Sequence, residues 1–221
     1  MTGSYGKFYL LLVLLILVVA GLLWREIYAT QKISIKEANQ PLISATTSNI
    51  PTDPSDQIYG NPGASLTLTE FVDLNDADSR RLHRDLAAFV DRYPSEARII
   101  FKHLPSRGFL SDSVVLHQGA FCAGKQGADK FWKFIGAAAI TNGKISDKEA
   151  ADLATANGVA LAGWEQCLKT SEAKSRVEAD LSLADALGLK KAPALFVNNK
   201  RINFLDEINV SNLLAELIKK Q

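Results

Sequence analysis

The residues with the clearest chemical potential in this chain are its two cysteines, Cys122 and Cys167. They lie far apart in the sequence, so they are not the C-x-x-C pair that carries out thiol–disulfide exchange. A zinc site is also excluded, because the chain has only 3 histidines and none clusters with the cysteines. In the cytosol two such thiols would be unremarkable, whereas in an oxidising compartment they are expected to pair. The compartment must therefore be established first.

A second chemical feature is a short polar segment that contains Asp73, Asn75, Asp76 and Asp78. Its oxygen atoms are ligands that a hard cation such as Ca²⁺ accepts. The EF-hand pattern fails, however, because Ala77 stands where a ligand belongs and no glycine follows. Aspartate is also a preferred helix N-cap. We therefore predict that Asp76 or Asp78 caps a helix, and we predict no metal and no cofactor.

The three histidines, His83, His103 and His117, have no neighbours in the sequence that would complete a catalytic group. We predict packing or surface positions for them. The composition also excludes a nucleic-acid role. The formal net charge of the 221 residues is only +1, and Lys and Arg are scattered instead of clustered.

The N-terminal segment from Phe8 to Trp24 contains no charged residue. At about 1.5 Å per residue a helix of this length spans roughly 25 Å, and aromatic and basic flanks extend it to the membrane interfaces. The alternative is a cleaved signal peptide, but its apolar core is usually only about 7–15 residues long. We predict a retained transmembrane anchor over residues 1–24. Charge alone leaves its orientation ambiguous, since Lys7 lies before it and Arg25 after it.

Residues 25–57 show no sustained helical or strand period and are interrupted by prolines and a Ser/Thr/Asn cluster. We predict a flexible tether there, followed by a globular domain over residues 58–221. This domain begins with a strand over residues 65–72, a helix that ends before Pro94, and a second strand over residues 97–104. A strand–helix–strand unit of this kind predicts that its two strands are parallel.

The rest of the domain is predominantly helical over about residues 106–189. Ser146 and Glu149 form a capping-box pattern, and Gly158 follows as a C-terminal stop. Beyond it, residues 194–204 predict a β-hairpin around Asn198 and Asn199, and a closing amphipathic helix follows.

These segments resemble the DsbA-like thiol oxidoreductases. The stretch GNPGASLTLTEFVDL resembles the opening strand of that family. FCAGKQGADKFW, GWEQCL and RVEADLSLADALGLKKAPALFVNNKRI resemble its helical insertion and return strand. The resemblance covers residues 58–221 and implies an α/β thioredoxin fold with a helical insertion.

The departure from the family is at the redox site. Where the family places C-P-x-C at the start of the helix, this chain has Asp76, Ala77, Asp78 and Ser79. Neither aspartate nor serine can form a mixed disulfide, so exchange chemistry cannot proceed there. Pro193 stands where the family has a cis-proline beside the site.

The resemblance has two further implications. Some relatives carry a structural disulfide where Cys122 and Cys167 stand, which implies a bridge here, the alternative being two buried free thiols. The fold also implies a bacterial inner-membrane protein whose soluble domain lies in the periplasm.

We therefore predict no catalytic residues and a redox-inactive accessory or scaffold subunit of a larger membrane protein complex. Three alternatives remain: an oxidoreductase with an unrecognised site, a glutathione-transferase-like enzyme, and a periplasmic chaperone. The kappa-class glutathione transferases of this fold carry serine at the first cysteine position, whereas here Ser79 occupies the second.

Overall fold

The computed structural model describes residues 12–25, 43–106, 113–203 and 209–219. The chain divides into two units, residues 1–41 and 42–221, and each is described by itself. In the first unit residues 12–25 are helical, and residues 1–11 of the predicted anchor lie outside the described residues. No helix in the described ranges has both the length and the apolar character needed to cross a membrane.

The second unit is built on a six-stranded sheet of order β1-β6-β5-β3-β4-β2. Its strands are β1 (Ile43–Thr47), β2 (Ile58–Gly60), β3 (Leu66–Val72), β4 (Ala97–His103), β5 (Ala194–Val197) and β6 (Lys200–Ile202). The two longest strands, β3 and β4, are parallel, with Leu66 opposite Ala97 and Val72 opposite His103. The parallel pair is the one predicted from the strand–helix–strand pattern, and the α/β class is confirmed.

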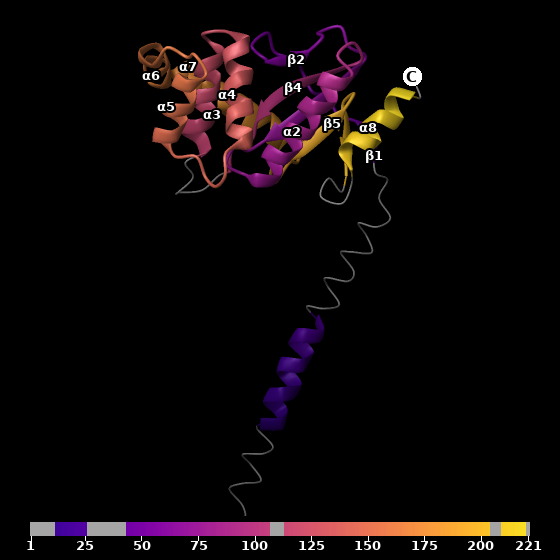
Figure 1. Cartoon of the computed structure of the whole chain (residues 1–221). Helices are drawn as coiled ribbons and strands as arrows, with labels where there is room; N and C mark the ends of the chain where they lie inside the picture. The colour runs from indigo at the N-terminus through magenta and orange to yellow at the C-terminus, as the bar shows by residue number, and fades with distance from the viewer. Residues whose placement is uncertain (1–11, 26–42, 107–112, 204–208, 220–221) are drawn as a thin grey trace, which may run out of the picture. The chain divides into compact units, whose positions relative to one another are not determined.

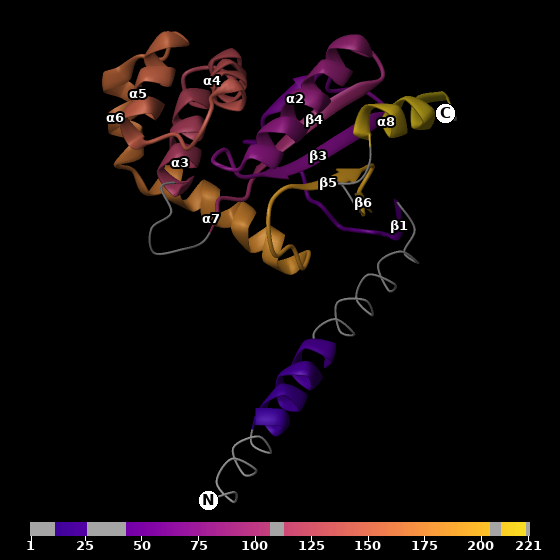
Figure 2. The same cartoon turned by 60° about the horizontal axis from the view of Figure 1, so that its bottom comes forward.

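Seven helices in the described part of this unit surround the sheet or extend beside it. They are α2 (Ala77–Arg92), α3 (Ser113–Gly124), α4 (Ala128–Ile140), α5 (Asp147–Ala156), α6 (Leu161–Leu168), α7 (Ser171–Ala186) and α8 (Val210–Lys219). Helices α3 to α6 gather at one end of the sheet (Figure 1). Helices α2 and α8 lie together on one face, and α7 runs along the other (Figure 2). The predicted helical insertion is therefore present.

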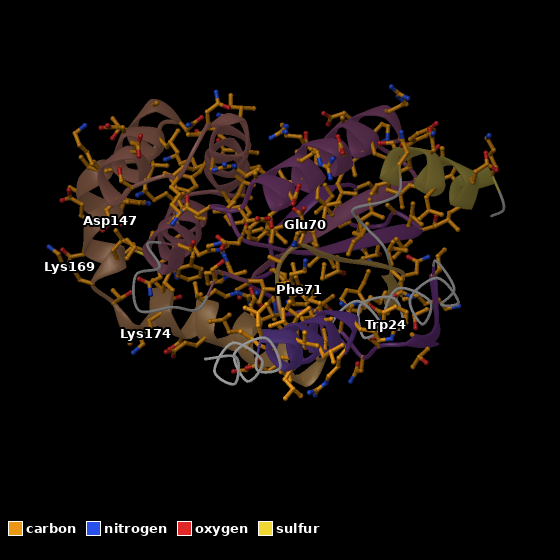
Figure 3. The ribbon with its side chains drawn as sticks, turned by 90° about the horizontal axis from the view of Figure 1, so that it is seen from below. Trp24, Glu70, Phe71, Asp147, Lys169 and Lys174 are labelled. Atoms are coloured by element: carbon orange, nitrogen blue, oxygen red, sulfur yellow. A yellow bond between two sulfur atoms is a disulfide. The ribbon has the colours of Figure 1, made fainter. Side chains whose placement is uncertain are left out.

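Alternation along β3 directs neighbouring side chains to opposite faces of the sheet. Leu66 and Leu68 pack with Leu86 of α2 and Leu214 of α8 in one buried cluster. Phe71 joins a separate cluster on the face that α7 covers. Glu70 and Phe71, adjacent in sequence, accordingly point to different sides in Figure 3.

The predicted hairpin and helix ends are confirmed. Asn198 and Asn199 connect β5 to β6 with φ angles of 47° and 65°, the backbone that a two-residue turn needs and that asparagine tolerates. The side chains of Ser146 and Glu149 complete a capping box at α5. Gly158 follows α5 with a φ of 77°.

The structure corrects the predicted tether of residues 25–57. Residues 26–42 lie outside the described ranges, but β1 pairs with β6, with Ile43 opposite Ile202. Ile50 is only 7% exposed and packs in the cluster that contains Phe71. The segment lacks a strand period because β1 is held at an edge by backbone hydrogen bonds, which leave little signature in the side chains.

Candidate functional site

The four residues that were aligned with the redox motif from the sequence, Asp76 to Ser79, form the N-terminus of α2. Asp76 is the N-cap, and its Oδ2 accepts a hydrogen bond from the backbone N–H of Ser79 at 2.7 Å. The Ser79 hydroxyl is buried and accepts from the backbone N–H of Asp73 at 3.2 Å. Ala77 and Asp78 are exposed. Asp76 and Ser79 thus stabilise the start of the helix, and neither supplies a nucleophilic sulfur.

The neighbouring polar residues hold loops together. The Asp73 carboxylate accepts hydrogen bonds from the backbone N–H groups of Asn75 at 2.9 Å and of Ser106 at 2.8 Å. Burial raises the pKa of Asp73, but the hydrogen bonds from Ser106 and from the backbone N–H of Asn75 outweigh it and hold that pKa well below its ordinary value. The Asn75 side chain pairs with both backbone groups of Ile145.

These bonds bear on the calcium alternative. The oxygens of Asp73, Asn75 and Asp76 face N–H donors, which is the opposite of what a cation needs. Within the described ranges no group of three or more His, Cys, Asp or Glu side chains is arranged to hold a metal ion.

A cavity of about 510 Å³ lies beside this helix end. Asp76 and Ala192 both line it, so the N-cap of α2 and the residue before Pro193 share one cavity. The peptide bond between Ala192 and Pro193 is cis. Lys190, Lys191 and Asp185 line the cavity as well and make it polar. The arrangement can bind a chain segment or a small polar molecule, but no thiol faces it.

Two of the three histidines meet in the interior. His103 and His117 are buried, and their Nδ1 atoms lie 2.9 Å apart. The backbone N–H of Leu74 donates to Nε2 of His117 at 3.0 Å, so that nitrogen carries no proton. His117 then holds its proton on Nδ1 and donates it to His103. The sequence predicted packing or surface positions, and the structure places both in the packed interior.

The buried histidine pair predicts a pH-dependent stability. Burial, together with the charges of Arg176 and Lys102, places the pKa of His103 well below its usual 6.5. The unfolded chain therefore takes up a proton near pH 6.5 that the folded chain refuses. Stability is complete above that pH and falls as pH drops below it, by up to about 1.4 kcal/mol per pH unit. Denaturant unfolding between pH 7.5 and 5.5 measures the slope.

The matched variant is His103→Gln, which accepts from His117 but does not titrate. It should flatten the slope. Burial raises the pKa of Asp180. At more acidic pH this carboxylate therefore opposes the loss of stability that His103 causes. The comparison is for that reason confined to the window above pH 5.5. An unchanged slope in the variant would assign the dependence to other groups.

The third histidine forms a separate buried pair on the same side of β4, where its ring and those of His103 and His117 all contact Phe101. Nδ1 of His83 lies 2.7 Å from Oε1 of Glu70, and both side chains are almost fully buried. The His83 ring stacks on Trp132, with ring centroids 6.1 Å apart. Oε2 of Glu70 has no hydrogen-bond partner among the described atoms. The pair ties α2 to β3.

A buried ionic cluster on the α7 side was not predicted from the sequence. Lys102 of β4 contacts Asp56 at 2.6 Å, and Arg176 of α7 contacts Asp56 at 2.8 Å and Asp180 at 2.7 Å. All four side chains are less than 10% exposed. Two cations balance two carboxylates, which is the condition for burying them. The cluster fastens the segment before β2 to the sheet and to α7.

Cys122 of α3 and Cys167 of α6 are joined by a disulfide, with their Cα atoms 5.7 Å apart. Cys122 is fully buried, and no free cysteine is present. The bridge lies within the hydrophobic cluster of the helical insertion, with Phe131 and Trp164. It lies in a different part of the domain from α2, so it is a structural bridge.

A sheet with α2 and α8 on one face, α7 on the other and an inserted helical cluster defines a thioredoxin-like fold of the DsbA type. The family model described as thioredoxin matches residues 52–219, and the chain belongs to this family. Solved structures share the fold. A thioredoxin-like oxidoreductase from Silicibacter pomeroyi is 24% identical with a TM-score of 0.66, and the match covers 76% of this chain and 93% of that one.

Two further solved structures share this fold. The thiol-disulfide exchange protein alpha-DsbA2 from Wolbachia pipientis is 16% identical with a TM-score of 0.66, covering 76% of this chain and 88% of that one. BdbD from Bacillus subtilis is 19% identical with a TM-score of 0.66, covering 80% and 98%.

One curated relative is described as a different class of protein. Over 155 residues, 67% of this chain, the sequence is 29% identical to a protein described as the Na(+)/H(+) antiporter NhaA of Nitrosospira multiformis. The chain spans 24% of the length of that relative, about a quarter.

Proposed function

We propose that this protein is a redox-inactive, membrane-anchored accessory subunit whose thioredoxin-like domain binds a larger membrane protein on the extracytoplasmic side. One observation carries the proposal. The fold around the former redox site is retained, while the two positions that need sulfur hold Asp76 and Ser79, which stabilise the start of α2. The cysteines of the chain are engaged elsewhere, in the bridge between α3 and α6.

The location rests on two features. Residues 8–24 are uncharged and apolar on every side, and a helix of that kind belongs in a membrane or a protein interior. We propose that they form one transmembrane helix of which residues 12–25 are the described part. A structural disulfide forms and persists in oxidising compartments, which supports an extracytoplasmic domain.

The similarity to a protein described as an antiporter supports the kind of partner. A segment that matches two thirds of this chain occurs in a protein named as a membrane ion transporter. We propose that the partner of the present chain is an integral membrane transport protein. An anchor confines the domain to the same bilayer and raises its effective concentration near such a partner.

A second candidate function rests on the cavity beside α2. Its volume of about 510 Å³ and its mixed lining of Asp76, Asp185, Lys190 and Lys191 suit a polar chain segment. In that function the protein is a periplasmic chaperone that holds peptides without oxidising them.

The test compares matched variants by co-purification in mild detergent. Deletion of residues 1–24 behind an export signal should strongly weaken association with the membrane partner. Asp76→Ala should lower the free energy of unfolding by about 1 kcal/mol through the lost cap, with association intact. Asp78→Ala, which removes an exposed aspartate that makes no cap, is the control for stability.

The outcomes separate the candidates. Loss of association in folded Asp76→Ala, with the anchor present, would shift the function to the cavity. Recovery of transient, unfolded clients by the domain without its anchor would support the chaperone function instead.

A further inference from the structure

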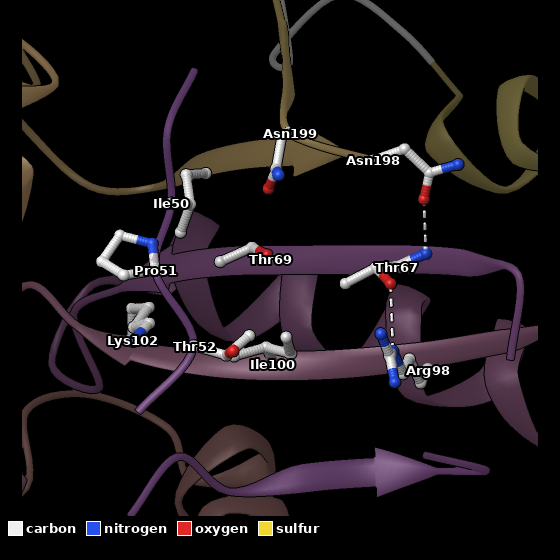
Figure 4. A pocket seen from close by; sticks show the side chains of 10 residues that line it. All are labelled: Ile50, Pro51, Thr52, Thr67, Thr69, Arg98, Ile100, Lys102, Asn198 and Asn199. Carbon is white, nitrogen blue, oxygen red and sulfur yellow. Dashed lines mark hydrogen bonds between the residues drawn. The ribbon is translucent and has the colours of Figure 1, made fainter. Parts of the chain in front are cut away.

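A second cavity, of about 260 Å³, lies on the face of the sheet opposite α2. Its floor is formed by β3 and β4, and the turn between β5 and β6 borders it on one side. Residues 50–52 cross in front of the floor (Figure 4). The residues that line it do not include those around Asp76, so this is a separate site.

The cavity contains a positive charge without a counter-charge. Arg98 of β4 is half-buried, and its Nε–H donates to the hydroxyl of Thr67 at 3.0 Å. In the described part of the chain, no carboxylate pairs with this guanidinium. The other cation of the lining, Lys102, is neutralised by Asp56 at 2.6 Å. The net charge that the cavity presents is therefore that of Arg98.

The remaining polar groups add hydrogen-bond donors. The Thr67 hydroxyl accepts from Arg98, so its own proton is available to a ligand. The Thr69 and Asn199 side chains point toward one another across the floor (Figure 4). Oδ1 of Asn198 accepts from the backbone N–H of Thr67 at 2.8 Å and so fixes the turn against β3. No acidic side chain is among the described residues that line the cavity.

We propose that this cavity binds a small oxyanion, a carboxylate or phosphate group, with the Arg98 guanidinium as its main ligand. The planar guanidinium fork matches two oxygens of such a group, and its bonds to an anion are stronger than neutral ones. The hydroxyls of Thr67 and Thr69 supply further donors on a rigid sheet. Ile50 and Ile100, both buried, exclude part of the water around the ion.

The test is a titration of the full-length ¹⁵N-labelled protein in detergent with sodium phosphate and with sodium acetate, at constant ionic strength set by sodium chloride. We expect saturable shifts of the Arg98 Nε–H signal and of the Thr67 and Thr69 amides. Arg98→Gln should weaken the binding by at least about tenfold. Thr69→Val, which keeps the side-chain shape, should weaken it by a smaller factor. Arg92→Gln is the control, because Arg92 is exposed on α2, which covers the other face.

Saturable binding of either oxyanion that is lost in Arg98→Gln and kept in Arg92→Gln supports the site, and the tighter of the two names the ligand class. Shifts that rise linearly, that chloride produces equally, or that fall alike in both arginine variants would overturn it. The proposed anion ligands come from neither the anchor nor the N-terminus of α2, so failure of this test leaves the proposed accessory function intact.

Discussion

Reduction of the bridge between Cys122 and Cys167 is expected to lower the free energy of unfolding by about 4 kcal/mol, on the chain-entropy estimate for a loop of this length. The bridge closes a separation of 45 residues that contains α4 and α5 and most of α6, so the unfolded chain loses much freedom when it is present. In a domain of this size the loss corresponds to a fall of roughly 8–16 °C in melting temperature. Thermal unfolding with and without a reductant measures it.

Cys122→Ala with Cys167→Ala is the matched variant, and reductant should not change its melting temperature. One contact between α3 and α6 remains in this variant. The Trp164 Nε1–H donates to the carbonyl of Gly119 at 2.7 Å, and the ring lies where a Cβ on Gly119 would be. If reduction leaves the melting temperature unchanged, this packing of α3 against α6 holds the helices without the bridge. Free thiols in protein isolated from its membrane would remove the main support for an oxidising compartment.

The parts of the fold that could be predicted are those with a local signature. The alternation of residues 65–72 produced β3, and the parallel partner β4 followed from the helix between them. Asn198 and Asn199 predicted a turn because few residue types adopt positive φ at low cost. Ser146 and Glu149 predicted a helix start because the capping box depends only on positions three residues apart.

The parts that could not be predicted depend on contacts between residues distant in sequence. Asp56 meets Lys102 and Arg176, which follow it by 46 and 120 residues, and nothing near Asp56 announces a buried carboxylate. The predicted tether of residues 25–57 therefore extended too far along the chain. The contact between His103 and His117 is of the same kind. Buried charges pair by tertiary geometry, and an isolated polar residue in a sequence is most often at the surface.

At the start of α2 the sequence predicted a helix cap in place of cysteines. It did not predict which residues line the cavity beside that cap. Asp76 as the N-cap follows from residue type and position. Lys190 and Asp185 join Asp76 only because the end of α7 and the segment after it lie beside the start of α2. The cavity on the other face required β4, β3 and the turn before β6 to be assembled, so no sequence pattern indicated Arg98.

Cysteines placed at positions 76 and 79 should convert this protein into a thiol–disulfide oxidoreductase. Position 76 is half-buried and is the N-cap of α2. Position 79 is buried and lies in the first turn of that helix. Residues three apart on a helix are near enough for a disulfide. A thiolate at position 76 would be stabilised by the N-terminus of α2, which should lower its pKa below about 8.5. The wild-type domain should show only background insulin reduction and dithiol-peptide oxidation.

The double variant Asp76→Cys with Ser79→Cys should turn over both substrates well above that background. Asp76→Cys alone is the control, because it can form a mixed disulfide but has no second thiol to resolve it. It should therefore react once and stop. An inactive but folded double variant would mean that this site has changed in more than its sulfurs, for example through the hydrogen bond from the Asp73 backbone to position 79. Turnover by the wild type that survives Cys122→Ala with Cys167→Ala would overturn the redox-inactive proposal itself, because no thiol would remain to explain it.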